Sequence, residues 1–265
     1  MKTDPVGIFD SGLGGLSVLQ QVRKILPEEA ILYVADSAHA PYGCKNTPFV
    51  EQRSRFITER LIEQGAKIIV IACNTATAST IEKFRQDYGI PFVGVEPGIK
   101  PAIQLSRNGK IGVLATTATL ASERYKQLVH RFASSVQLYN QPCPGLADQI
   151  EAGQPDSSKT QLLLTQYINP LIAENIDTLV LGCTHYSFLS EAIKKITSGE
   201  IIMVDTSQAV AEQLKRVLQS EQLKSRNFSK GISLQVKYYS TGSITETARA
   251  IKTLMHLDVE VSELC

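Results

Sequence analysis

Short runs of Val, Ile and Leu alternate along the chain with longer stretches in which apolar residues recur every three or four positions. The short runs are typical of strands covered on both faces, and the longer spacing is typical of amphipathic helices, as at 49–65. The predicted strands are 6–10, 30–36, 67–73, 91–96, 110–116, 135–140, 178–183 and 201–205. Strands that alternate with helices predict an α/β fold with parallel sheets.

The order of these elements repeats. The strand at 6–10 resembles the strand at 110–116, and the strand that ends at Cys73 resembles the strand that ends at Cys183. One further strand lies between the members of each pair. The pattern predicts two similar α/β domains that are related by a pseudo-twofold axis.

The end of the chain adds one more unit. A helix pattern begins near Ser207, and a strand and a helix follow it after a polar stretch. We expect this last unit to pack against the first half. The predicted first domain therefore comprises 1–97 and 208–265, and the predicted second domain comprises 98–207.

Composition and charge exclude several classes of protein. The 43% hydrophobic content is enough for sizeable cores, and 27 basic against 26 acidic residues leave no strongly basic face for a nucleic acid. No apolar run approaches the ~20 residues of a membrane helix. The first residues lack the apolar segment of a signal peptide. These features predict a cytosolic protein with neither nucleic acid nor a membrane as its partner.

Two of the five cysteines occupy similar positions in the two halves. Cys73 and Cys183 each end a predicted buried strand and precede small polar residues that begin a helix, where the helix dipole lowers a thiol pKa from about 8.5. Packing alone would explain one such cysteine, but two equivalent ones suggest thiols that flank one ligand. Cys44, Cys143 and Cys265 lack this setting, and we expect them to be structural or incidental.

A glycine-rich stretch follows the first strand. Gly12, Gly14 and Gly15 allow a sharp turn before a helix, but Ser17 stands where a dinucleotide fingerprint needs its third glycine. The stretch is equally compatible with a plain tight turn and with a cradle for a carboxylate or phosphate. Asp10 lies at the carboxyl end of its strand, where α/β sheets place their ligands, although it could instead cap the helix.

Other polar side chains follow neighbouring strands. His185 lies two positions after Cys183 and could act as an acid/base group, as a zinc ligand or as a surface residue. The close ligand pairs that are typical of zinc sites are missing, so no metal is predicted. Tyr42 lies in a turn set by Pro41 and Gly43 and could present its hydroxyl.

Threonines follow the fifth predicted strand. Thr116 and Thr119 provide hydroxyl groups at the beginning of another helix. They could bind a carboxylate or cap the helix, and this stretch by itself favours capping.

Two thiols, one carboxylate, one imidazole and several neutral donors suit racemisation. One base removes a proton from a carbon atom, and an acid on the opposite face returns one. Alignment of the halves places Ala115 opposite Asp10 and Thr75 opposite His185. Each thiol therefore has a different helper, and we expect Asp10 to assist Cys73 and His185 to assist the other thiol.

These residues resemble the glutamate racemases, which are cofactor-independent enzymes of the aspartate/glutamate racemase superfamily. The matching motifs are GIFDSGLGGLSVL, ADSAHAPYG, IACNTAT, TTATLAS and LGCTHY. The resemblance implies interconversion of L- and D-glutamate without a cofactor, D-glutamate for peptidoglycan synthesis in the bacterial cytoplasm, and a homodimer. It also implies two α/β domains with the site between them.

The resemblance also implies roles for individual residues. Cys73 and Cys183 match the catalytic thiols that deprotonate D-glutamate and L-glutamate, respectively. Asp10 and His185 match the assisting acid/base residues, and Glu151 matches a supporting acidic residue. The positions that match substrate contacts are Ser11, Pro41, Tyr42, Gly43, Asn74, Thr75, Thr116, Thr119 and Thr184.

Two alternatives remain open at this point. The first is a racemase of the same superfamily that acts on aspartate or another amino acid. The second belongs to another class and is either a nucleotide-binding oxidoreductase or a non-catalytic amino-acid-binding protein. The pair of thiols after matching strands argues against a protein that only binds.

Overall fold

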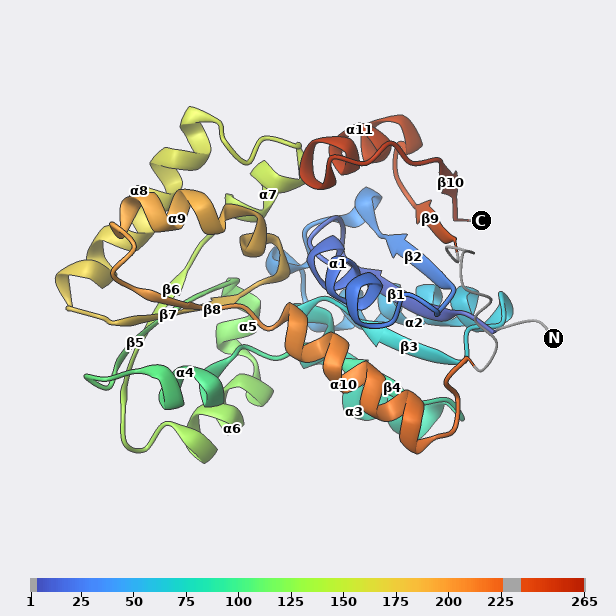
Figure 1. The fold of residues 1–265 in the computed structure, drawn as a ribbon, viewed down its shortest axis with the longest axis horizontal. Coiled ribbons are helices and arrows are strands. Elements are labelled where there is room, and N and C mark those ends of the chain that lie inside the picture. The colour runs from blue at the N-terminus through green and yellow to red at the C-terminus, as the bar shows by residue number, and fades with distance from the viewer. Residues whose placement is uncertain (1–3, 226–234, 265) are drawn as a thin grey trace.

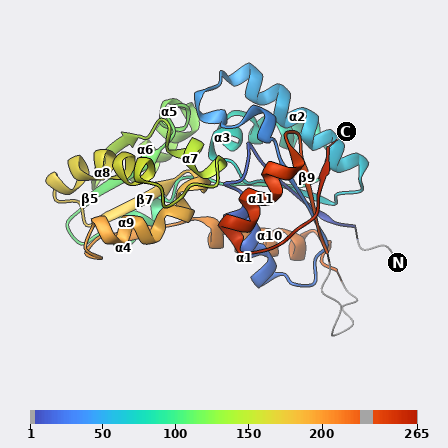
Figure 2. The ribbon, with the colours of Figure 1, turned by 90° about the horizontal axis from the view of Figure 1, so that it is seen from above.

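The computed structural model describes residues 4–225 and 235–264, which form two parallel β-sheets covered by helices (Figure 1). The prediction for Cys265 lies outside the described residues. In the view from above, the two sheets and their helices form two lobes placed side by side (Figure 2).

The first sheet has six strands in the order β10-β9-β2-β1-β3-β4. Every pair of neighbours in it is parallel. Its strands are β1 (Val6–Asp10), β2 (Ile31–Ala35), β3 (Ile68–Ile71), β4 (Phe92–Gly94), β9 (Val236–Ser240) and β10 (Val261–Glu263). All residues of β1, β2 and β3 are buried, as expected for strands that helices cover on both faces.

The second sheet has four parallel strands in the order β6-β5-β7-β8. Its strands are β5 (Lys110–Ala115), β6 (Gln137–Pro142), β7 (Thr178–Gly182) and β8 (Ile202–Val204). The order repeats that of β2-β1-β3-β4 in the first sheet, so the predicted duplication is confirmed. All predicted strands up to 201–205 are present.

The last unit of the chain returns to the first sheet. Strand β9 pairs with β2, and β10 pairs with β9, which places the C-terminal end on the far side of the first lobe (Figure 1). The predicted packing of this unit is therefore confirmed. The three-residue strand β10 was not predicted, and the domain boundaries at 97 and 207 stay predictions.

Helices connect the strands and cover both faces of the sheets. The α-helices are α1 (Leu16–Ile25), α2 (Thr47–Glu63), α3 (Asn74–Asp87), α4 (Ile99–Leu105), α5 (Thr117–Ala121), α6 (Glu123–Phe132), α7 (Leu146–Glu151), α8 (Ser158–Ala173), α9 (Ser190–Ile196), α10 (Ser207–Ser220) and α11 (Ile244–Met255). The 3-10 helices are η1 (Ser37–His39), η2 (Tyr42–Cys44) and η3 (Thr184–Leu189). No helix in the described part of the chain is long and apolar enough to cross a membrane.

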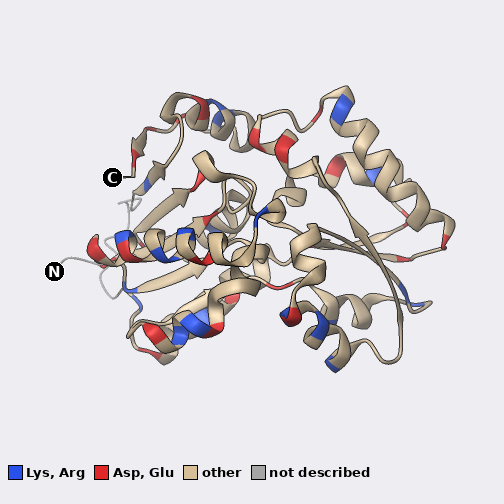
Figure 3. Ribbon diagram, turned by 180° about the vertical axis from the view of Figure 1, so that it is seen from behind, with Lys and Arg blue, Asp and Glu red and all other residues tan. Residues whose placement is uncertain are grey.

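One apolar cluster joins the two halves. It includes Ile8 of β1 and Leu19 of α1 together with Leu164 of α8 and Leu179 of β7. The other face of each sheet has its own smaller cluster. In the ribbon seen from behind, Lys and Arg positions are interspersed with Asp and Glu positions (Figure 3).

Candidate active site

The strand order brings four chain segments to one place. In each half the central strand, β1 or β5, lies between the next strand of the chain, β2 or β6, and the one after that, β3 or β7. The carboxyl ends of the central strand and of its β3 or β7 neighbour therefore lie together, at the point where open α/β sheets bind ligands. Asp10 ends β1, Cys73 follows β3, Thr116 follows β5 and Cys183 follows β7.

Cys73 is buried, and its thiol has two polar neighbours. The Ala76 N–H donates to its sulfur over 3.5 Å, and the thiol lies 3.7 Å from the Ser11 hydroxyl. Burial raises the pKa of the Cys73 thiol well above its ordinary value, and the nearby Asp10 carboxyl raises it further. The prediction that the helix N-terminus lowers this pKa is wrong, because the single N–H donor does not offset desolvation.

Asp10 is fully buried beside the glycine-rich stretch. Its Oδ2 accepts the N–H of Gly15 over 2.7 Å, and its Oδ1 accepts the Ser11 hydroxyl over 3.3 Å. Burial raises the pKa of Asp10, an effect that the charge of His185 reduces. Asp10 therefore reaches the Cys73 thiol through Ser11. Its bond to Gly15 precedes α1, which begins at Leu16 without a side-chain cap, so the capping alternative is wrong.

The second thiol has a different set of neighbours. The sulfur of Cys183 lies 3.5 Å from Nδ1 of His185, and Nε2 of His185 lies 2.5 Å from Oε1 of Glu151. Burial alone lowers the pKa of His185, but hydrogen bonds and charges from Cys183 and Glu151 raise it well above its ordinary value. The segment after Cys183 is helical, as predicted, and is the 3-10 helix η3.

The glycine-rich stretch of the first half packs against the helpers of the second half. The Leu13 N–H donates to Glu151 Oε1 over 2.7 Å. A Cβ atom on Gly12 would lie 2.1 Å from the same oxygen, and a Cβ on Gly14 would lie 2.4 Å from Nδ1 of His185. The glycines therefore bring the backbone close to protein carboxylates and imidazole, as a cradle does for an anion.

Both thiols line one small cavity of about 10 Å³. Its lining residues are Ser11, Pro41, Tyr42, Gly43, Cys73, Asn74, Thr75, Thr116, Ala147, Cys183, Thr184 and His185. Of these, only Ala147 was not predicted from the sequence, because an isolated alanine carries no chemical pattern. Asp10, Glu151 and Thr119 lie outside the lining and contact it through hydrogen bonds.

Two polar features of the cavity suit an anionic ligand. The Thr75 hydroxyl lies 3.1 Å from that of Thr116 and 3.3 Å from that of Thr119, which joins hydroxyls of both halves. Thr116 also accepts the N–H of Thr119, so its predicted capping role is present. Among the described residues, the buried Nδ2 of Asn74 has no hydrogen-bond partner. Buried donors are nearly always paired, so this one is available to a ligand.

Tyr42 differs from its prediction. Its hydroxyl donates to Oδ2 of Asp36 over 2.5 Å, so its proton is not available to a ligand. Asp36 was missed from the sequence, although it closes the second predicted strand just as Asp10 closes the first. The same position relative to a parallel strand could have identified it.

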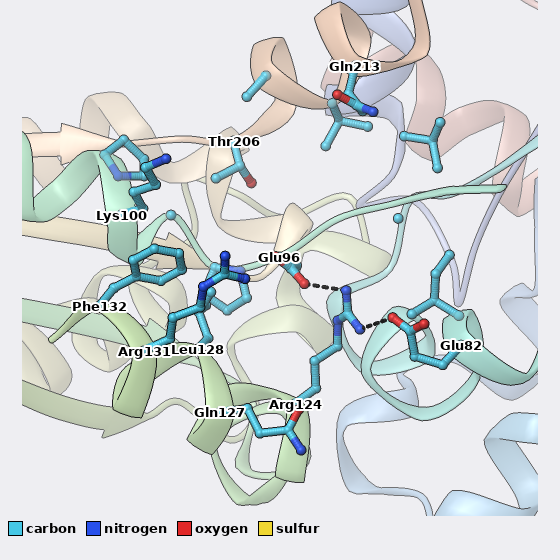
Figure 4. A pocket seen from close by; sticks show the side chains of 18 of the residues that line it. Glu82, Glu96, Lys100, Arg124, Gln127, Leu128, Arg131, Phe132, Thr206 and Gln213 are labelled. Carbon is cyan, nitrogen blue, oxygen red and sulfur yellow. Dashed lines mark hydrogen bonds and ion pairs between the residues drawn. The ribbon is translucent and has the colours of Figure 1, made fainter. Parts of the chain in front are cut away.

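A larger cavity than the one between the thiols lies elsewhere. It has a volume of about 660 Å³ and is lined by parts of α3, α4, α6 and α10, without either catalytic-site cysteine. Arg124 of α6 extends across it and pairs with Glu82 of α3 and with Glu96, which follows β4 (Figure 4). This cavity thus contains an ion-pair bridge between the halves.

Comparison with known proteins identifies the family. Residues 15–214 match the model of the Asp/Glu/Hydantoin racemase family. The chain belongs to this racemase family. The match covers the second sheet and the part of the first lobe that carries Cys73, so both thiols lie within the matched region, whereas Asp10 and Ser11 precede it.

Relatives within the racemase family extend over nearly the whole chain. The glutamate racemase of Ectopseudomonas mendocina is 45% identical over 97% of both chains. The crystal structure of glutamate racemase isoform RacE1 from Bacillus anthracis has a TM-score of 0.87 at 31% identity and covers 99% of this chain and 97% of its own. The Escherichia coli glutamate racemase, solved with L-glutamate and the activator UDP-MurNAc-ala, has a TM-score of 0.84 at 29% identity, with 98% and 97% covered. The protein is therefore an isomerase with the two-lobed fold of these racemases.

Proposed function

We propose that the protein interconverts L-glutamate and D-glutamate by proton transfer between the substrate α-carbon and two cysteines. The observation that carries the proposal is that Cys73 and Cys183 follow equivalent strands of two halves with the same strand order, and line one cavity. The names of the relatives support glutamate as the substrate. The buried donor of Asn74 and the hydroxyls around Thr75 suit its carboxylates.

The reaction moves one proton off the α-carbon and another onto it. With L-glutamate, the thiolate of Cys183 takes the α-proton and becomes a thiol, while the thiol of Cys73 gives its proton to the opposite face of the carbanion. The raised pKa of Cys73 keeps this thiol protonated before the reaction, as a proton donor requires. The reverse reaction starts with the two sulfurs in the opposite protonation states.

The helpers make the two half-reactions different. An imidazolium at His185, held by Glu151, lies within reach of the Cys183 sulfur and stabilises negative charge there. Ser11 and Asp10 serve the Cys73 side. The N–H groups at the start of α3 and η3 and the exclusion of water stabilise the developing carbanion.

The physiological role extends this proposal. D-Glutamate formed by the enzyme supplies peptidoglycan synthesis in the bacterial cytoplasm, and the working unit is a homodimer. The bacterial origin of the relatives and the family resemblance support this role. Neither a metal nor an organic cofactor enters the proposed reaction.

The decisive test is chiral analysis of L-glutamate incubated with the metal-stripped protein in heavy water. D-Glutamate with solvent deuterium at the α-carbon is expected. Cys73→Ala and Cys183→Ala are each expected to abolish turnover, and L-aspartate run in parallel tests the alternative substrate. Turnover that needs an added cofactor, or that persists without Cys73, would exclude the two-thiol mechanism.

A further inference from the structure

A buried carboxylate lies behind the loop that closes the catalytic cavity. Asp36 has no exposed surface and directly follows β2. Its oxygens accept hydrogen bonds from Nε and Nη2 of Arg53 over 3.0 and 2.8 Å, from the Tyr42 hydroxyl over 2.5 Å, and from the Thr241 hydroxyl over 2.7 Å. Nδ1 of His39 lies 3.1 Å away. Asp36 is therefore a fully paired buried anion, which fixes the groups around it.

The loop that this anion holds belongs to the active site. Pro41, Tyr42 and Gly43 all line the cavity between the thiols. A Cβ atom added to Gly43 would lie 2.7 Å from Cβ of Thr116, so the loop contacts the other half without spare room. A shift of a few tenths of an ångström in the loop therefore changes the shape of the cavity.

One of the four side chains on Asp36 comes from the far end of the sequence. Thr241 directly follows β9, which pairs with β2 in the register Ala35↔Ser240. Its hydroxyl donates to Asp36 and accepts the N–H of Ala38 over 3.3 Å, and its own N–H donates to the Ala35 carbonyl over 3.1 Å.

The neighbouring glycine shows how close this approach is. A Cβ on Gly242 would lie 3.0 Å from the backbone nitrogen of Ala38 and 3.2 Å from Cβ of Ser37. The turn after β9 is therefore seated directly on the segment that leads from Asp36 to Tyr42. The hydrogen bonds of Thr241 go to Asp36 and Ala38, which do not line the cavity. Thr241 nevertheless supports the loop that does line it.

We propose that Thr241 is a positioning residue for substrate binding, because it orients Asp36 and through it the cavity-lining loop at Pro41–Gly43. This inference rests on the proposed racemase function. It gives the C-terminal unit a part in the active site that the positions of the two thiols do not reveal.

The experiment compares three variants of the full chain at a temperature well below their unfolding transitions. Thr241→Val keeps the shape of the side chain and removes its hydroxyl, and Thr241→Ser keeps the hydroxyl. Thr247→Val is the matched control, because it removes a hydroxyl bonded to Ser240 in the same unit without touching Asp36. Glutamate racemisation is measured for each enantiomer as KM and kcat separately.

Loss of the Thr241 hydroxyl is expected to raise KM for both enantiomers about fivefold, the effect of one hydrogen bond, and to leave kcat within about twofold. Thr241→Ser is expected to restore KM, and Thr247→Val is expected to leave KM unchanged. If Thr241→Val folds poorly, Tyr42→Phe removes a bond to the same carboxylate from the loop side and is expected to raise KM likewise. An unchanged KM, or an equal rise in Thr247→Val, overturns the proposal.

Hydrogen–deuterium exchange of peptides covering residues 36–45 gives a readout that needs no activity. Exchange in this segment is expected to be faster in Thr241→Val and unchanged in Thr247→Val, because only the former loosens the loop. Wild-type protein that does not racemise glutamate defeats the proposed function. Faster exchange in Thr241→Val would still support the role of Thr241 in positioning the loop. Unchanged exchange in Thr241→Val would exclude this positioning role even when the wild type is active.

Discussion

At the residue scale, the site is two similar thiols with unlike surroundings. Cys73 has a hydroxyl and a backbone N–H beside it, with Asp10 one step behind. Cys183 has the imidazole of His185 in direct reach. A symmetric pair of bases thus has asymmetric helpers, and each helper is expected to affect one proton transfer more than the other.

Asp10→Asn and His185→Asn are predicted to slow opposite directions of the reaction. Each is expected to lower kcat about a hundredfold in the direction in which the assisted thiolate removes the α-proton of the substrate. A loss of this size is typical of an acid/base group. The ratio of kcat/KM values is fixed by the equilibrium, so the measurement uses kcat and α-deuterium isotope effects for each enantiomer. The same isotope pattern in both variants would contradict separate helpers.

The carboxylate of Glu151 is predicted to control the protonation of His185. Removing the negative charge in Glu151→Gln destabilises the imidazolium, so the raised pKa of His185 is expected to fall. NMR titration of the imidazole measures this, and the signal that disappears in His185→Asn provides the assignment. A pKa of His185 that stays the same or rises in Glu151→Gln would show that the carboxylate does not hold the proton.

At the scale of elements, local chain geometry places the groups that react. Thr116 accepts an N–H of the helix that follows it, and Cys73 accepts the N–H of Ala76 as α3 begins. The turn between β1 and α1 donates hydrogen bonds to two carboxylates, from the Gly15 N–H to Asp10 and from the Leu13 N–H to Glu151. That turn joins the two halves at the level of the helpers.

Gly12→Ala is predicted to displace Glu151 and with it His185. The new Cβ would lie 2.1 Å from the carboxylate, so the carboxylate must move and kcat/KM is expected to fall more than about tenfold. Gly89→Ala is the matched control, because no atom lies within 4 Å of its added Cβ, and its kinetics are expected to be those of the wild type. Wild-type kinetics in Gly12→Ala would mean that this contact does not set the position of His185.

At the scale of the whole molecule, the two halves share one apolar cluster and are further linked by polar contacts. The links include the hydroxyls of Thr75 and Thr116, the Leu13–Glu151 hydrogen bond, and the ion pairs of Arg124. Of these links, the contact between Thr75 and Thr116 lines the cavity between the thiols, so the relative position of the halves sets the geometry of the reaction.

The Arg124–Glu82 pair is predicted to contribute weakly to this link. A double-mutant cycle of Arg124→Ala and Glu82→Ala in urea unfolding is expected to give a coupling of about 0.5 kcal/mol, because Glu82 is largely exposed. The coupling is expected to vanish in about 1 M salt. Arg131 lies in the same helix and contacts the Phe132 ring of its own half, so Arg131→Ala is the control. It is expected to show no coupling with Glu82→Ala. A coupling that survives high salt would indicate packing, not charge.

The alternation of buried strands and helices determined the α/β class, the duplication and the end of each strand where reactive groups gather. These features follow from local periodicity, which a sequence displays directly. The same reasoning located the two thiols and both helpers. Asp36 also stands at the end of a predicted strand, but its role depends on Arg53 and Thr241, which lie far from it in the sequence.

Tertiary structure alone decided the environment of each group. The pKa of Cys73 depends on burial by segments far along the chain, and the direction of the Tyr42 hydroxyl depends on Asp36. The place of Ala147 in the cavity lining and the contact of Thr241 with Asp36 arise from the packing of distant segments, not from neighbouring residues. The sequence thus determined which chemical groups stand at the strand ends, and the packing of distant segments determined their protonation, orientation and support.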